Sequence, residues 1–129
     1  MKKLLFVWFF LVSSLFSFEI KELESISQIK KNQDVIIMFS TTYCPWCHRQ
    51  TRVFNELGFK REDSLQIVKV NDNSEIYKEL VKKYPFTIKY FPTSFLINYE
   101  EDDLFIIHEF RGYQNEESIV KVLDDEDRF

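Results

Sequence analysis

A continuous run of five apolar residues, Val35-Ile36-Ile37-Met38-Phe39, constrains the fold of this chain more than any other feature. A strand formed by such a run has no polar side chain on either face, so it must be covered on both faces. That arrangement is typical of a central strand in a parallel or mixed sheet between helices. The run therefore predicts an α/β fold with these residues at its centre.

The hydrophobic spacing of the remaining sequence predicts one mixed α/β domain. Gly58 stands where a glycine would end a helix, and Asn115 stands where an asparagine would cap the last helix. A right-handed crossover would set two strands parallel, and the acidic turn over 100–103 would join an antiparallel pair. The expected helices cover 22–31, 45–57, 74–84 and the residues after 115, and the expected strands cover 35–39, 65–70, 93–98 and 104–110, in the order β-α-β-α-β-β-α after an extra N-terminal helix.

The first seventeen residues have the pattern of a secretory signal peptide. Lys2 and Lys3 precede an apolar run over 4–16, which ends at the small Ser17 before the chain becomes polar. A membrane-spanning helix needs about 20 apolar residues, so a short uncleaved anchor is the less favoured alternative. We expect residues 1–17 to be a signal peptide and residues 18–129 to be a domain secreted across the inner membrane into the periplasm, where disulfides persist.

Glycine, histidine and charge content exclude several functions. The only glycines, Gly58 and Gly112, are too far apart for a loop that binds phosphate groups or a dinucleotide. His48 and His108 cannot form the HExxH pair of a zinc protease, and neither glycine belongs to the Gly-x-Ser-x-Gly turn of an esterase. The 17 basic and 21 acidic residues become 15 and 21, a formal charge of −6, once Lys2 and Lys3 are removed. No nucleic-acid partner is expected, because a phosphate-binding face needs clustered Lys and Arg.

Both cysteines lie in the motif Cys44-Pro45-Trp46-Cys47, at the start of the helix that follows the apolar strand. A helix N-terminus favours thiolate over thiol, so Cys44 is the expected nucleophile in disulfide exchange. Cys47 lies one helical turn further on and is expected to resolve the mixed disulfide formed by Cys44. Pro45 suits the first turn of a helix, and Trp46 places a large ring beside the reactive sulfur.

Three other interpretations of the two cysteines remain open. A purely structural disulfide would close so short a loop that it constrains the unfolded chain very little. A zinc site would need both cysteines and both histidines, and His48 is poorly directed for the ion that Cys47 would bind. The main alternative is a c-type cytochrome electron carrier, because Cys44-Pro45-Trp46-Cys47-His48 has the C-x-x-C-H form of a haem attachment site. Cytochromes of this size are mostly helical, whereas this motif follows an apolar strand.

A second motif, Lys89-Tyr90-Phe91-Pro92-Thr93, places a proline at the start of an expected strand. With the C-P-W-C motif and the later Phe110-Arg111-Gly112-Tyr113, it resembles the thioredoxin family over residues 33–124. The resemblance implies a thioredoxin fold and a thiol–disulfide oxidoreductase that needs no cofactor or metal. It also implies that Pro92 follows a cis peptide bond close to the active disulfide, and that Phe91 offers its backbone to an extended substrate.

The resemblance also indicates where this chain is unusual. Met38 stands where cytosolic thioredoxins have a buried aspartate that helps to move a proton, and Tyr90 stands where the family often has glycine. The length leaves no room for the insertion of the periplasmic oxidant or the dimerisation domain of the isomerase. We therefore expect a monomeric reductase or electron relay that exchanges disulfides with proteins and is reset by a membrane redox partner. His48 is a candidate for tuning the Cys44 thiolate, and Tyr43, Trp46, Tyr90 and Phe91 are candidates for an apolar substrate platform.

Overall fold

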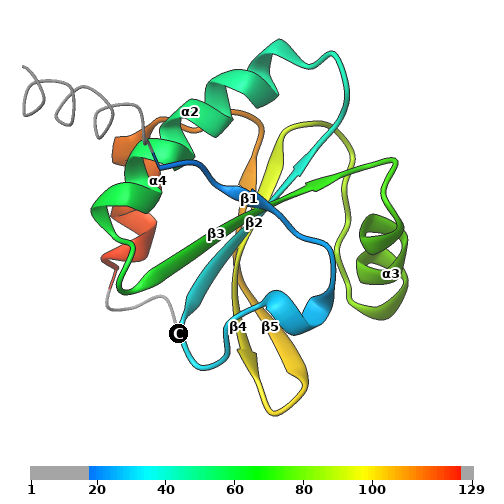
Figure 1. Cartoon of the computed structure of the whole chain (residues 1–129). Coiled ribbons are helices and arrows are strands. Elements are labelled where there is room, and N and C mark those ends of the chain that lie inside the picture. Colours follow the sequence, from blue (N-terminus) through cyan, green and yellow to red (C-terminus); the bar gives the residue numbers. More distant parts are fainter. Residues whose placement is uncertain (1–17, 126–129) are drawn as a thin grey trace, which may run out of the picture.

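A computed structural model describes residues 18–125 as a five-stranded mixed sheet with helices on both faces (Figure 1). No helix within this range is both long enough and apolar enough to cross a membrane. The signal peptide predicted over 1–17 lies outside the described residues. The elements are β1 (Lys21–Glu22), the 3-10 helix η1 (Ile26–Gln28), β2 (Asp34–Ser40), α2 (Pro45–Lys60), β3 (Leu65–Asn71), α3 (Glu75–Lys83), β4 (Thr93–Glu100), β5 (Asp103–Arg111) and α4 (Glu116–Leu123).

The strands lie in the order β1-β3-β2-β4-β5, with β2 between β3 and β4. Strand β3 runs parallel to both β1 and β2, whereas β4 runs antiparallel to both β2 and β5. Every residue of β2 from Val35 to Ser40 is buried. The prediction of a central apolar strand in a mixed α/β sheet is therefore confirmed.

Alternate residues of β2 face two separate hydrophobic layers. Ile36 and Met38 belong to the layer beneath α2 and α4, whereas Val35, Ile37 and Phe39 belong to the layer beneath α3. Figure 1 shows α2 and α4 on one side of the sheet and α3 on the other. Two covered faces explain why the strand contains no polar residue between Asp34 and Ser40.

The helix predicted over 22–31 is wrong. The chain forms the short edge strand β1 instead, and the backbone N–H of Leu23 donates to the Lys69 carbonyl oxygen of β3 (2.9 Å). The Gln28 side chain then accepts hydrogen bonds from the backbone N–H groups of Glu24 (2.8 Å) and Ser25 (3.3 Å). Pairing with β3 thus replaces helical hydrogen bonds, and only the one turn of η1 remains.

Gly58 lies inside α2 rather than beyond its end, so the helix boundary predicted there is also wrong. A Cβ atom at position 58 would lie 2.5 Å from Cε1 of Phe18, well inside van der Waals contact. The glycine therefore serves close packing between the N-terminal segment and the helix, and α2 continues for two more residues to Lys60.

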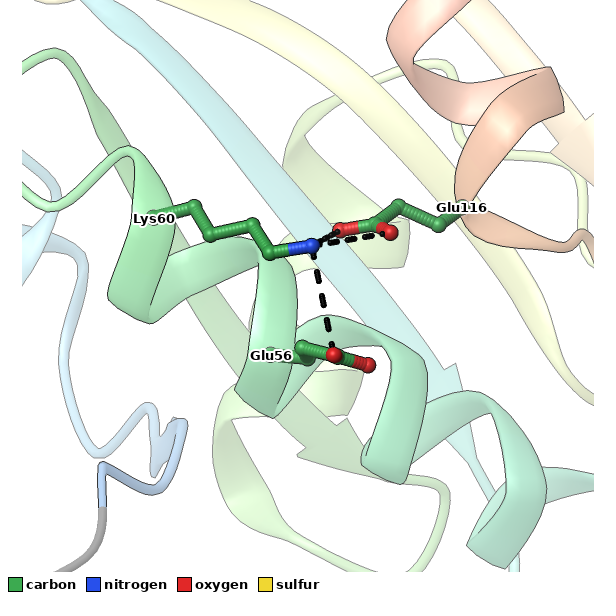
Figure 2. A network of polar contacts seen from close by, with 3 residues as sticks. All are labelled: Glu56, Lys60 and Glu116. Carbon is green, nitrogen blue, oxygen red and sulfur yellow. Dashed lines mark hydrogen bonds and ion pairs between the residues drawn. The ribbon is translucent and has the colours of Figure 1, made fainter.

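Ion pairs join the end of α2 to α4. Figure 2 shows Lys60 between two carboxylates: its Nζ lies 2.9 and 3.2 Å from the oxygens of Glu116, and 3.9 Å from Oε1 of Glu56. Arg61 makes a two-point contact with Asp124 through its terminal nitrogens (2.9 and 3.0 Å). These contacts hold α4, and with it the loop that precedes α4, against α2.

Candidate active site

The two cysteines form a disulfide at the point where β2 leads into α2. Their Cα atoms are 5.2 Å apart. Cys44 is the N-cap residue of α2, and its sulfur accepts a hydrogen bond from the backbone N–H of Cys47 (3.1 Å). The first cysteine therefore lies where the free N–H groups and the positive end of the helix dipole stabilise a thiolate.

The two sulfur-bearing residues differ in access to solvent. Cys44 is half-buried, whereas Cys47 is only 5% exposed and packs with the layer beneath α2. This asymmetry matches the predicted roles, because an entering disulfide needs access to the nucleophile while the resolving thiol acts inside the protein. Tyr43, just before the pair, has a φ of 59° and is 96% exposed, so the tight turn directs its ring into solvent.

Trp46 lies in an aromatic and cationic cluster beside the disulfide. Its ring, half exposed, lies 5.5 Å from the ring of Tyr113, centroid to centroid. The guanidinium carbon of Arg49 lies 4.7 Å from the Trp46 centroid, within cation–π range. The structure thus adds one aromatic residue, Tyr113, and one cation, Arg49, to the residues predicted to surround Cys44.

Gln50, which was not among the residues predicted from the sequence, fixes the loop that carries Tyr113. Gln50 is 1% exposed; its Nε2 donates to the Gln114 carbonyl oxygen (3.0 Å), and its Oε1 accepts from the Gln114 N–H (2.7 Å). Gly112 begins this loop with a φ of 68°, which glycine adopts without strain. One signal was present in the sequence, because position 50 lies on the helical stripe of Cys47 and Phe54, where a polar residue is unexpected.

The second motif contains the cis bond that the resemblance implied, whereas the substrate-binding role of Phe91 stays a prediction. The Phe91–Pro92 peptide bond is cis, and Pro92 is buried at the start of β4. The Thr93 hydroxyl donates to the Tyr90 carbonyl oxygen (2.7 Å), which closes the turn. Phe91 packs against both hydrophobic layers, including the one that holds Cys47. Tyr90 is 48% exposed.

No carboxylate occupies the position beneath Cys47. Met38 is fully buried there, and the Thr51 hydroxyl lies 3.9 Å from its sulfur while donating to the Cys47 carbonyl oxygen (2.8 Å). A pocket of about 330 Å³ reaches Cys47, and its lining includes His48 and Lys69 but neither aspartate nor glutamate. His48 is exposed and borders this pocket. Its predicted effect on Cys44 stays a prediction.

The fold also bears on the alternatives for the cysteines. The five-stranded sheet contradicts the mostly helical architecture that the cytochrome interpretation required. Within residues 18–125, no three side chains of the histidine, cysteine, aspartate or glutamate type gather closely enough to hold a metal ion. His108 is exposed on β5, where its ring contacts Phe110.

Comparisons with known proteins agree with the geometry. A family model described as thioredoxin matches residues 18–125. No curated protein matches the chain. An uncharacterised thioredoxin-like protein from Clostridium perfringens is 23% identical, with a TM-score of 0.65, over 85% of this chain and 83% of that one. A thioredoxin from Thermus thermophilus is 16% identical, with a TM-score of 0.62, over 82% and 84%. A thioredoxin from Trichomonas vaginalis is 18% identical, with a TM-score of 0.53, over 70% and 75%.

Proposed function

Because the chain belongs to the thioredoxin family and carries a redox-active Cys44–Cys47 disulfide, we propose that it is an exported oxidoreductase that exchanges disulfides with protein substrates. The observation that carries the proposal is the half-buried Cys44 at a helix N-terminus with the buried Cys47 one turn behind it. An accessible nucleophile and a sheltered resolving thiol are the two parts that disulfide exchange requires.

The proposed reaction is a two-electron exchange. In the reduced protein, the Cys44 thiolate attacks one sulfur of a substrate disulfide, and the other substrate sulfur leaves as a thiolate. Cys47, once deprotonated, attacks the Cys44 sulfur of this mixed disulfide, which releases the second substrate thiol and forms the Cys44–Cys47 disulfide. The substrate disulfide is reduced and the protein pair is oxidised. A redox partner must then return two electrons to the pair.

We propose the reducing direction, or relay of electrons, rather than oxidation. The connections between β3 and α3 and between α3 and β4 are short, without the helical insertion of the family's periplasmic oxidant. A membrane protein that passes electrons outward would reset the site. The Lys2 and Lys3 pair followed by the apolar run over 4–16 supports export, and the family match begins directly after Ser17.

The substrate surface is proposed to be aromatic. Trp46 lies beside Cys44, and Phe91 precedes the cis Pro92 on the segment that packs against the cysteine layer. In this proposal the Phe91 backbone binds an extended substrate strand while Trp46 contacts substrate side chains. Main-chain hydrogen bonds to an extended peptide give affinity that depends little on the substrate sequence.

Trapping of mixed disulfides tests the roles of the two cysteines. Cys47→Ser keeps the attacking thiol but removes the resolving one, so it should accumulate mixed disulfides with partner proteins that dithiothreitol releases. Cys44→Ser is the matched control and should trap far fewer partners. Equal trapping by the two variants would contradict the assigned roles.

Two measurements test direction and location. The equilibrium of the pair with glutathione should give a potential nearer the about −270 mV of thioredoxin than the about −120 mV of the strong periplasmic oxidant. Fractionation of producing cells should recover the protein outside the cytoplasm. A potential near −120 mV would refute the reducing direction, and recovery only in the cytoplasm would refute export.

A further inference from the structure

The active-site end of the domain is cationic, although the chain as a whole carries four more acidic than basic residues. Four segments lie at this end: 41–53 with the cysteines, 84–95 with the cis proline, 111–115 with the loop before α4, and the turn over 71–74, whose Asp72 N–H donates to the Ser40 carbonyl oxygen (2.9 Å). The first three contain no aspartate or glutamate, and each contains at least one lysine or arginine, whereas the turn over 71–74 contributes one acid, Asp72. Lysines and arginines therefore outnumber acids in these four segments, in contrast to the acidic chain as a whole.

Three cationic and three aromatic side chains lie at this end of the domain, and we call this set the rim. The Arg49 guanidinium lies over the ring of Trp46, which contacts the ring of Tyr113. Two residues before Tyr113, Arg111 ends β5, where it pairs in register with Thr93. Arg111 and Tyr90 line the same groove. The rim thus consists of Arg49, Trp46, Tyr113, Arg111, Tyr90 and Lys89.

A groove of about 570 Å³ lies beside the cis-proline turn, and its apolar residues Phe95 and Ile106 belong to the layer beneath α3. Lys89, Tyr90, Thr93 and Arg111 line it. It also contains one acid, Glu109, whose Oε2 lies 2.6 Å from Nε of Arg111. That bond uses a single N–H, and a guanidinium has four others for binding a carboxylate. The groove therefore offers two cations next to the segment that leads into Phe91.

We propose that the preferred protein substrates carry their reactive cysteine in an extended segment flanked by acidic residues. This inference rests on the proposed function, because it assigns the chemistry of the substrate to the same site. A segment whose sulfur reaches Cys44 and whose backbone passes Phe91 runs toward Tyr90, Lys89 and Arg111. Carboxylates on that side bind Lys89 and Arg111, while apolar groups on the other side contact Trp46 and Tyr113.

Three peptides that differ only in charge test this. Each contains one cysteine in a mixed disulfide with uncharged mercaptoethanol, flanked on both sides by two aspartates, two serines or two lysines. The reduced full-length protein is mixed with each peptide, and the second-order rate of reduction is followed by chromatography at low and high salt. One exposed ion pair changes a rate by up to about fivefold. We therefore expect the acidic peptide to react about 5- to 20-fold faster than the basic one at low salt, and this ratio to fall at high salt.

Charge-reversal variants connect the preference to the groove. Lys89→Glu with Arg111→Glu should abolish or invert the acid-over-base ratio. Lys30→Glu with Lys121→Glu makes the same change of net charge at exposed positions away from the rim and should retain the ratio. Should the double reversal fail to fold, the single variants Lys89→Gln and Arg111→Gln should each reduce the ratio.

The outcomes separate the two proposals. If the wild-type protein reduces none of the peptides, the proposed function and this inference both fail. If it reduces all three at equal rates, or if the Lys89 and Arg111 variants keep the full preference, disulfide exchange stands and the acidic-substrate inference is overturned.

Discussion

Removal of the Gln50 amide tests whether one buried side chain holds the loop beside the disulfide. Gln50→Leu keeps a similar side-chain volume but removes both hydrogen bonds to the backbone of Gln114. A buried donor or acceptor left without a partner costs about 1–3 kcal/mol. Gln114 is half-buried, so water satisfies part of this demand. We expect a loss of about 2–3 kcal/mol in the free energy of unfolding, which corresponds to about 10–20 °C in melting temperature for a domain of this size.

The assay combines urea denaturation with fluorescence. In a Trp8→Phe background Trp46 is the only tryptophan, so its emission reports on the contact with Tyr113. Gln50→Leu should shift that emission under native conditions because the loop is released. Gln114→Ala removes a half-buried side chain whose one donated hydrogen bond, to the Arg111 carbonyl oxygen (3.0 Å), is exposed to solvent, and it should cost less than about 1 kcal/mol. A Gln50→Leu effect no larger than that of Gln114→Ala, with unchanged emission, would refute the reasoning.

Gln50→Glu adds a test with a defined sign in pH. A protonated glutamic acid has one donor and one acceptor, like the amide, so at about pH 4 the variant should be close to wild type. Burial against a carbonyl oxygen disfavours the ionised form, so the pKa of this carboxyl is raised in the folded protein. The unfolded chain releases its proton above about pH 4.3, so the stability of the variant relative to wild type should decrease as pH rises from about 4 to 7.

Two further predictions concern packing and alkaline pH. Gly58→Ala should destabilise the wild-type protein, because the added Cβ would lie 2.5 Å from the Phe18 ring. In a Phe18→Ala background the same substitution should stabilise the protein by about 0.5–1 kcal/mol, because alanine has the higher helix propensity. If the two substitutions have additive effects on the free energy of unfolding in urea, the contact between positions 18 and 58 is contradicted. Burial raises the pKa of Tyr99 above its usual value, so the unfolded chain ionises first and stability should fall as pH rises above about 10. Tyr99→Phe should reduce the loss of stability between about pH 9 and 11, whereas Tyr43→Phe, at an exposed position, should not. Equal urea midpoints for the two variants over this pH range would be evidence against Tyr99 as the source of the loss.

The strands and the cysteine pair were predictable because their signals are local. An uninterrupted apolar run over 35–39 fits only a strand covered on both faces, and the structure places it at the centre of the sheet. The structure contains the Cys44–Cys47 disulfide and a cis bond before Pro92, but the relation between the two motifs was predicted from the resemblance to a family. Pro92 follows Cys47 by 45 positions in the sequence, and only the pairing of β4 beside β2 explains why both lie at one end of the sheet.

The errors arose where a distant partner overrides a local pattern. Apolar spacing at Leu23, Ile26 and Ile29 fits a helix, yet the open edge of β3 binds the backbone there as a strand. Gly58 has the sequence context of a helix end, but the Phe18 ring, forty residues earlier, accounts for the glycine. The rim of cations was missed for the same reason, because Lys89 and Arg111 are distant in sequence and line one groove only in the fold.

Helix α2 connects these features and restricts how the site can move. Its first turn carries the disulfide, its second turn holds the Tyr113 loop through Gln50, and its last turn is tied to α4 through Lys60. Attachments along three successive parts of one helix leave little freedom for Cys44 relative to the sheet. The loop over 112–115 contacts α2 through the Gln50 amide and the ring of Trp46, and Asn115 joins it to α4 as the N-cap residue. Movement of Tyr113 away from Trp46 should therefore depend on Gln50, which joins the loop to the same helix that carries the cysteines.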